Sequence, residues 1–425
     1  MSQHESNTPD ANGPDAGRRP AEVGLFDELL TEPRLFKQRD KLRPAHTPVT
    51  LPHRTTEIAS LAGVLAGTLH GETTAHVLLY GKTGTGKTAC VRSVTRELER
   101  AAARLERHVT VVYVNCEVTD TQYQILAHLT NVLVESNRAL TGDPNAGPEP
   151  VPMTGFPTEV VYDTLIEAAS VVERSVIVVL DEVDQLASSG GDSVLYNLAR
   201  LNGLLDSSRV TLVGISNDLT FTESLDPRVR SRLGTDEIVF PPYDAGQLTD
   251  IITERAAVAF EPGVIDAGVF ALVAALAAQE HGDARRALDL LRVAGELAER
   301  DGAQTVTEAH VRDAKARVEF DHTEQLVDSL PTQSKLVLLA VADFPEGAPV
   351  EGVHERYTRL CTSFGMEPLS GARMSSAFGD LDSLGLVTVA SKTRPRRRDV
   401  RLSLRWRDLR RILAADSRFA NLASE

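Results

Sequence analysis

The sequence predicts an α/β domain built on a parallel sheet, followed by a small helical domain and a C-terminal winged-helix domain. Three observations support this prediction. Between about residues 46 and 245, short apolar runs alternate with helical patterns, which indicates βαβ units with helices on both faces of a sheet. From 246 to 316, apolar residues recur at three- and four-residue spacing. The last hundred residues contain three helical patterns and then two β-prone runs, the order of a winged helix.

Five short apolar runs should form the parallel sheet. The region after them is too short and too helical to extend that sheet, so it should form a separate helical unit. The expected strands are Val77–Tyr80, Val111–Asn115, Val176–Leu180, Val210–Ile215 and Ile238–Phe240.

Composition and these patterns give the expected domain boundaries. Residues 1–22 are polar and rich in Pro, Gly and Asn, so we expect a disordered tail there. The α/β domain should cover 23–245, the helical domain 246–320 and the winged helix 321–425. A Pro/Gly-rich stretch at 141–157 should be a surface loop between two helices.

The net charge of −15 is unevenly distributed along the chain. Residues 325–425 hold 15 basic and 12 acidic residues, a local charge of +3, so the first 324 residues carry −18. A nucleic-acid partner is therefore compatible with the C-terminal part. Arginine outnumbers lysine by 38 to 7. So few lysines in an acidic chain suit a cytoplasm of high salt, although a GC-rich genome could produce the arginine bias alone.

Several classes of protein are disfavoured. The three cysteines are odd in number and far apart, which argues against a disulfide framework or a zinc cluster. No apolar run approaches the roughly 18–20 residues that span a bilayer, and the N-terminus lacks an apolar signal-peptide core. Neither a G-x-S-x-G nucleophile turn nor an H-E-x-x-H metal motif occurs. We expect a cytoplasmic protein with no membrane partner.

The most specific motif is GKTGTGKT at Gly81–Thr88. It follows an apolar strand and opens a helix, which is the context that the G-x-x-x-x-G-K-[ST] pattern requires and which disfavours a chance Gly-rich turn. The glycines let backbone N–H groups cradle phosphates, Lys87 should reach the β- and γ-phosphates, and Thr88 should bind Mg²⁺. We expect ATP or ADP with Mg²⁺, held by Gly81, Gly84, Thr85, Gly86, Lys87, Thr88 and Ala89.

Two further strands end in polar residues beside this loop. In VIVVLDEVD, a buried strand delivers Asp181 and Glu182 to the carboxyl edge of the sheet, where ligands of open α/β sheets bind. Asp181 should hold Mg²⁺ through water and Glu182 should orient the attacking water. A solvated acidic strand end is the alternative, which the neighbouring phosphate loop disfavours. Asn217, at the end of VTLVGISND, would position that water or the γ-phosphate.

Together these residues resemble the AAA+ ATPases, and more narrowly the archaeal origin-recognition and cell-division-control replication initiators. The resemblance covers about residues 35–405. Together with the acidic, lysine-poor composition, it leads us to expect a halophilic archaeon as the source. It rests on the order and spacing of LFKQRDKLRPAHTPVTLPHR at Leu35–Arg54, the phosphate loop, VNCEVTD, LDEVD, GISND, LDPRVRSRLG at Leu225–Gly234, FPPYDAGQLTDIITERA and HGDARRALDLLR at His281–Arg292.

The resemblance implies further nucleotide contacts. Arg285, in GDARRALD, looks like the arginine by which the lid senses the γ-phosphate, whereas Arg286 is better explained as a surface residue. Tyr243 and Arg255 match positions that contact nucleotide in the family. An arginine finger aimed at a neighbouring subunit would be one of three residues, between which spacing does not choose: Arg228, Arg230 and Arg232.

The winged helix should contain helices at 332–344, Val350–Phe364 and Gly371–Leu384, then strands at Leu386–Ala390 and Val400–Leu404. Its third helix should be the recognition helix, with Leu381, Leu384 and Leu386 toward the core and Arg373, Ser375 and Ser376 near base edges. The turn between the strands is basic and should contact DNA phosphates, although a charge run is often only a solvated loop. Its cations include Lys392, Arg394, Arg396, Arg397 and Arg398.

The leading hypothesis is an ATP-dependent replication initiator that binds origin DNA repeats and promotes origin opening or recruitment of the MCM helicase. Other initiator subunits on the DNA are possible partners, and the protein would be associated with the nucleoid. Hydrolysis would be slow and switch-like, as the resemblance implies. Two alternatives remain: an ATP-gated transcriptional regulator or non-loading paralogue, which shares every motif, and a clamp-loader-like subunit, which predicts a C-terminal oligomerisation collar instead of a winged helix.

Overall fold

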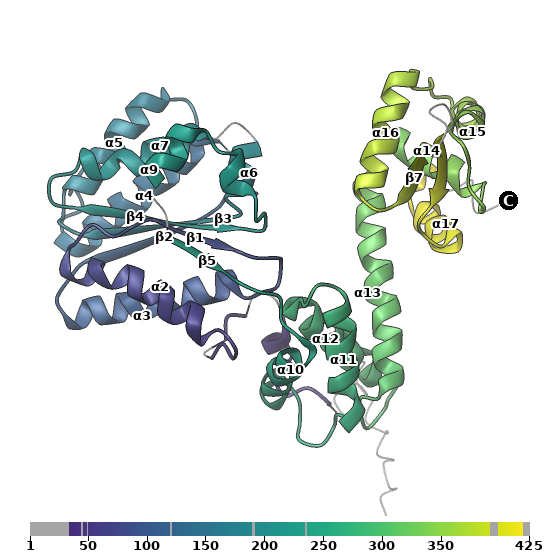
Figure 1. Cartoon of the computed structure of the whole chain (residues 1–425), viewed down its shortest axis with the longest axis horizontal. Coiled ribbons are helices and arrows are strands. Elements are labelled where there is room, and N and C mark those ends of the chain that lie inside the picture. Colours follow the sequence, from purple (N-terminus) through teal and green to yellow (C-terminus); the bar gives the residue numbers. More distant parts are fainter. Residues whose placement is uncertain are drawn as a thin grey trace, which may run out of the picture.

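The computed structural model describes residues 34–43, 46–48, 50–119, 121–188, 192–233, 236–391 and 398–419. Figure 1 shows three bodies in chain order, an α/β domain, a helical lid and a winged-helix domain. The lid lies between the other two, and one long helix leads from it into the winged helix. The fold class expected from the sequence is confirmed. The expected disordered tail at 1–22 lies outside the described residues.

Five parallel strands form the sheet of the α/β domain, in the order β2-β3-β4-β1-β5. Both faces are buried: in β1, Val77 and Leu79 enter one core while Leu78 and Tyr80 enter the other, as the two-residue period of a strand requires. Each strand contains or overlaps one expected from the sequence. Their bounds are β1 Val77–Tyr80, β2 Val109–Asn115, β3 Ser175–Asp181, β4 Arg209–Ser216 and β5 Asp236–Val239.

Helices cover the two faces of this sheet. One face packs against α2 (Thr55–Leu65) and α3 (Lys87–Arg104), and the other against α4, α5, α7 and α9 (Figure 1). The loop expected at 141–157 runs between α4 and α5. The remaining helices of the domain are α4 Gln122–Thr141, α5 Thr158–Ser170, α6 Asp184–Ser188, α7 Asp192–Arg200, α8 Phe221–Ser224 and α9 Pro227–Leu233, with short 3-10 helices at Ala66–His70 and Leu201–Gly203.

The lid contains α10, α11, α12 and the first part of α13 around one apolar core. An N-terminal segment completes this core, although the sequence analysis grouped it with the α/β domain. The Phe36 ring stacks on Phe260, 4.4 Å between centroids, and the backbone N–H of Leu35 donates to Glu299 Oε1 at 2.9 Å. The bounds are α10 Ala245–Ala259, α11 Ala267–Gln279, α12 Ala284–Arg300 and α13 Glu308–Ser329, with a 3-10 helix at Arg39–Leu42.

The helix α13 is continuous across the boundary expected at residue 320 and carries the winged helix. That domain packs three helices on a three-stranded antiparallel sheet of order β6-β8-β7. Two elements were not anticipated, β6 and α17. The latter packs against α13, with the Arg411 guanidinium 5.0 Å from the Phe320 ring. The bounds are α14 Thr332–Ala342, β6 Ala348–Pro349, α15 Val350–Ser363, α16 Gly371–Ser383, β7 Val387–Ser391, β8 Arg398–Leu402 and α17 Trp406–Ala415.

One residue expected in the winged-helix core is exposed. Leu381 and Leu386 are buried, but Leu384 is 41% exposed, so the expectation for Leu384 is wrong. The reason is local: α16 ends at Ser383, and Gly385 turns the chain with a φ of 70° before it enters β7.

A buried ion pair in the winged helix gives a stability prediction. The Lys335 ammonium is almost fully buried, 2.9 Å from Asp416 Oδ2 and 3.9 Å from Asp328 Oδ1. Asp416→Asn should lower the free energy of unfolding by up to about 3 kcal/mol, because it removes the nearer partner of a buried charge. Adding Lys335→Met should restore part of the loss. Thermal melts followed by circular dichroism measure both effects.

This prediction has a pH dependence. Hydrogen bonds from Arg418 and Lys335 hold the pKa of Asp416 below its usual range. A carboxyl group whose pKa is lower in the folded than in the unfolded chain stabilises the fold at pH values above the unfolded-state pKa, which is about 4. This stabilisation is lost as the pH falls toward the pKa of the folded state. The difference between wild type and Asp416→Asn should therefore be constant near neutral pH and shrink in acid. Equal melting temperatures at pH 7 would contradict the assignment.

Candidate functional site

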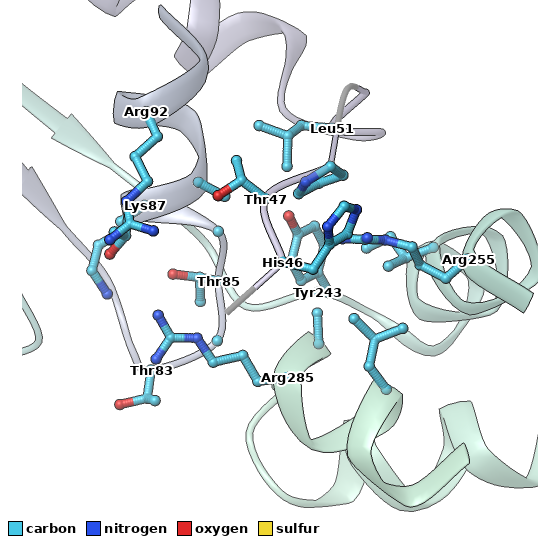
Figure 2. Close-up of a pocket in the computed structure, with 18 of the residues that line it drawn as sticks. His46, Thr47, Leu51, Thr83, Thr85, Lys87, Arg92, Tyr243, Arg255 and Arg285 are labelled. Atoms are coloured by element: carbon cyan, nitrogen blue, oxygen red, sulfur yellow. The ribbon is translucent and has the colours of Figure 1, made fainter. Parts of the chain in front are cut away.

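A cavity of about 530 Å³ lies where the phosphate loop, the segments at residues 46–48 and 50–52 and the lid meet (Figure 2). Its volume is typical of small-molecule sites, which span about 300–1,000 Å³. The loop between β1 and α3 forms one wall, and Asn115, Asp181 and Asn217 reach it from the carboxyl ends of β2, β3 and β4. The sheet order explains this meeting, because parallel strands end at one edge.

The phosphate loop adopts a conformation that needs glycine. Gly84 and Gly86 have φ values of 73° and 94°, in the left-handed region. Gly86 is also the N-cap of α3, and no side chain caps that helix. The first N–H groups of α3 are therefore suited to an anion such as phosphate.

Lys87 lies in the cavity wall and is held by the loop. Its Nζ donates to the Lys82 carbonyl and to Asn217 Oδ1, both at 2.9 Å, and to the carbonyl of Gly81. Gly81 therefore supports the lysine from behind, whereas Gly84 to Ala89 line the cavity. Burial, with the charge of Arg285 as the next cause, lowers the pKa of Lys87 to about 8.

Oxygen atoms suited to a magnesium ion meet beside this lysine. The Thr88 hydroxyl donates to Asp181 Oδ2 at 3.0 Å, and both side chains line the cavity. Hydroxyl and carboxylate oxygens are the ligands that Mg²⁺ prefers, so the residues present fit the ion. Glu182 follows Asp181 with an unusual φ of 58°. Burial, together with the charges of Glu117 and other nearby carboxylates, raises the pKa of Glu182.

The lid closes the cavity from the other side. Asp283 caps α12 by accepting from the backbone N–H of Arg285 at 2.8 Å, and the N–H of Ala284 donates to the Gly84 carbonyl at 3.2 Å. Arg285 reaches the cavity, as Figure 2 shows, whereas Arg286 forms an ion pair with Glu280. The positive N-terminal end of α12 therefore faces the phosphate loop.

The far end of the cavity is apolar and aromatic. Tyr243 is buried there, which raises its pKa to about 12, and Leu51 and Ile251 lie beside it. Arg255 donates to the Lys41 carbonyl at 3.1 Å. Burial, with the charges of Arg255 and Lys41, lowers the pKa of His46. Flat apolar walls beside polar groups suit a nucleobase.

The structure brings together most of the site residues named from the sequence, but not all. Arg228 and Arg230 are exposed on α9 and do not line the cavity, and the side chain of Arg232 lies outside the described residues. Sequence reasoning missed several lining residues. Asn115 could have been found, since it ends the strand beside Asp181. Further lining residues that were not singled out include Arg43, His46 and Glu117, which lie inside the motifs Leu35–Arg54 and VNCEVTD without a role of their own, and Arg92, one turn along α3.

Those residues proposed for DNA contact that the structure describes belong to the winged helix and do not line the cavity. Arg373, Ser375 and Ser376 are exposed in the first turns of α16. Most of the wing lies outside the residues that the structure describes. These undescribed parts include Lys392, Arg394, Arg396 and Arg397, and the side chain of Arg398 at the start of β8. Within the described residues, no group of three or more His, Cys, Asp or Glu side chains could hold a metal ion, and no helix is long and apolar enough to cross a bilayer.

Comparisons with known families match three parts of the chain. The description "AAA ATPase domain" matches residues 50–213, "Cdc6 AAA+ ATPase-type lid domain" matches 249–316, and "CDC6, C terminal winged helix domain" matches 325–411. These segments fall in the three bodies of the fold.

Whole-chain relatives agree with this division. An ORC1-type DNA replication protein of Pyrococcus furiosus is 47% identical over 92% of this chain and 93% of its own length. ORC1-type DNA replication protein 7 of Halobacterium salinarum is 42% identical over 94% of this chain and 91% of its own. The solved structure of the Aeropyrum pernix ORC1 protein in complex with DNA is 42% identical, with a TM-score of 0.81 over 92% of this chain and 100% of that one.

The pKa of Lys87 gives a prediction for nucleotide binding. A bound polyphosphate would raise this pKa from about 8, so binding above pH 8 takes up a proton. The Kd for ADP should be flat near neutral pH and rise by up to about tenfold per pH unit above 8. Titration calorimetry in buffers of different ionisation enthalpy measures the proton uptake. Lys87→Arg should bind without this pH dependence, and Lys87→Ala should not bind; unchanged affinity in Lys87→Ala would refute the phosphate site.

Proposed function

The chain belongs to the family of ORC1-type DNA replication proteins, and on that premise we propose that it is an ATP-dependent replication initiator that binds double-stranded origin DNA. One observation carries the proposal. A cavity with the residues for Mg·ATP lies between the α/β domain and the lid, and the continuous helix α13 joins that lid to the winged helix. A change in lid angle on nucleotide exchange would therefore move the DNA-binding end of the molecule.

ATP or ADP would bind with its phosphates on the loop and its base at the aromatic end. The N–H groups at the start of α3 and Lys87 would hold the phosphates, while Thr88 and Asp181 would hold Mg²⁺. Tyr243 and Arg255 would lie beside the base and ribose. The donor set observed in the cavity supports this arrangement.

Hydrolysis, in this proposal, is slow and serves as a switch. Glu182 would orient the attacking water, and Asn217, already bonded to Lys87, would fix the γ-phosphate or that water. Bound Mg²⁺ supplies electrostatic stabilisation of the charge that develops on the transferred phosphoryl group. Arg285 would balance that charge from the lid, so its position would report whether the γ-phosphate is present.

A second subunit on the DNA would complete the site. The exposed Arg228 and Arg230 of α9 remain candidates for an arginine finger toward a neighbour's ATP, together with Arg232.

DNA binding would use the winged helix. Arg373, Ser375 and Ser376, which are exposed near the start of α16, would meet base edges in the major groove as a recognition helix does. The basic wing, from Lys392 through Arg394, Arg396 and Arg397 to Arg398, would contact phosphates. The Aeropyrum pernix ORC1 protein, solved with DNA, supports this use of the fold.

The initiator would then promote origin opening or recruit the MCM helicase from its place in the nucleoid. A non-loading paralogue or an ATP-gated transcriptional regulator would share every residue discussed above. A clamp-loader-like role is disfavoured, because it predicts an oligomerisation collar where this chain has a winged helix.

Genome-wide binding separates the initiator from the regulator. Chromatin immunoprecipitation of the protein in growing cells should show enrichment at the sites where replication starts, because an initiator acts there. Mapping of nascent strands in the same culture identifies those sites independently. Enrichment at promoters alone would reject the initiator role while leaving ATP and DNA binding intact.

The wing gives a second prediction. Replacing Arg394, Arg396, Arg397 and Arg398 by Ala should weaken binding to all DNA sequences and flatten the salt dependence, by up to about one unit of slope per lost phosphate contact. Fluorescence anisotropy at several salt concentrations measures both quantities.

A matched control removes the same charge elsewhere. Arg96, Arg100, Arg104 and Arg107 are exposed on or just after α3, and replacing them by Ala should leave the salt slope unchanged. An unchanged slope in the wing variant, or an equal loss in the control, would show that the wing is only a solvated loop.

A further inference from the structure

Arg54 is a buried arginine that contacts the phosphate loop from behind. Its side chain is 1% exposed and does not line the cavity. The Nε atom donates to the Thr85 carbonyl at 2.8 Å, inside the GKTGTGKT motif. Arg54 ends the Leu35–Arg54 motif and precedes α2, and the motif by itself assigned it no role in the site.

The same guanidinium reaches the joint between sheet and lid. Its Nη2 donates to the Pro241 carbonyl at 2.6 Å, and its carbon atom lies 3.9 Å from the centre of the Tyr243 ring. Its Nη1 donates to Glu57 Oε1 at 3.0 Å, which supplies a counter-charge for the buried cation. Arg54 therefore ties the phosphate loop to the residues that lead into α10.

Peptide geometry gives these contacts a consequence for phosphate binding. In a planar trans peptide, the carbonyl and the following N–H point in opposite directions. Arg54 holds the Thr85 carbonyl on the side away from the cavity, so the N–H of Gly86 in the same peptide is directed toward the cavity. A cationic donor also polarises that peptide, which makes its N–H a stronger donor to an anion.

The packing around Gly86 shows how closely this arrangement is constrained. A Cβ atom built on Gly86 would lie 2.9 Å from the Tyr243 hydroxyl and 3.9 Å from Arg54 Nε. The loop, the arginine and the tyrosine therefore pack without room for a side chain. A shift of Arg54 would have to move Thr85 and Gly86 with it.

We infer that Arg54 is a positioning residue for the phosphate loop: it aims the Gly86 N–H at the phosphates and couples the loop to the lid joint. The inference rests on the proposed nucleotide site and adds a residue that acts through the loop without touching the ligand. Arg54 does not line the cavity, and Tyr243, the residue of the base end that it touches, is also held by the hydrogen bond from its backbone N–H to the Gly282 carbonyl at 3.3 Å. Loss of Arg54 should weaken phosphate recognition and leave recognition of the base unchanged.

The test compares ligands with and without phosphates. In the full-length chain, Arg54→Met should raise the Kd for ADP by at least about tenfold, the scale of one hydrogen bond from a charged group. Arg54→Lys, which can reach one acceptor but not the whole set, should have an intermediate Kd. Titration calorimetry measures ADP, and ligand-observed NMR measures adenosine, whose Kd should stay within about twofold of wild type.

A matched control separates positioning from general destabilisation. Arg174 is also buried, at the opposite end of the strands, where its Nη1 donates to Ser136 Oγ at 2.9 Å. Arg174→Lys should lower the melting temperature without changing the Kd for ADP. If Arg54→Met does not fold, Arg54→Lys against Arg174→Lys decides the question.

The outcomes that overturn the inference are distinct from failure of the proposed function. Wild-type affinity for ADP in the Arg54 variants, or equal weakening of ADP and adenosine, would reject a positioning role on the loop. A wild-type chain that binds neither ADP nor ATP would reject the proposed nucleotide site itself, and this inference with it.

Discussion

The docking of α12 onto the phosphate loop determines how the three bodies of the protein relate. The N–H of Ala284 donates to the Gly84 carbonyl, and a Cβ atom on Gly84 would overlap the Asp283 carboxylate. The lid therefore touches the phosphate loop closely, through the backbone of Ala284 and the short side chain of Asp283. Since α12 packs along α13 and α13 continues into the winged helix, movement at this contact would be transmitted along these helices.

Charge explains why this contact would respond to a nucleotide. Arg285, at the start of α12, contributes to lowering the pKa of Lys87, which means that the two cations repel each other across the cavity. Phosphates between them would replace that repulsion with attraction and would also interact with the positive end of α12. A γ-phosphate would add charge to those phosphates and so strengthen the attraction to Arg285. Di- and triphosphate would therefore hold the lid with different strength, which is the requirement for a switch.

The sheet and the phosphate site could be predicted because their signals are local. β1 has the bounds that its apolar run indicated, and Lys87, Thr88 and Asp181 meet because parallel strands end at one edge. Other features depend on partners that no local pattern reveals. Leu35 packs in the lid through a hydrogen bond to Glu299, 264 residues away. Arg54 ends the Leu35–Arg54 motif, but its contacts with Thr85 and Pro241 form only in the folded chain, so the role inferred for it could not be predicted from the sequence.

Nucleotide binding and DNA binding should differ in their dependence on salt concentration. Lys87 and Arg54 at the phosphate loop are buried, and buried charges are screened weakly. The contacts proposed between the wing arginines and DNA phosphates would instead weaken with salt, by counterion release. At an ionic strength of 1 M the Debye length is only about 3 Å. In such a medium nucleotide binding would persist, whereas contacts between the wing and the phosphates of DNA would lose strength. Selection of an origin would then depend on contacts that salt does not screen. These are the approach of Arg373, Ser375 and Ser376 to base edges and the recognition of groove shape, while the wing would set the orientation of the domain on the DNA.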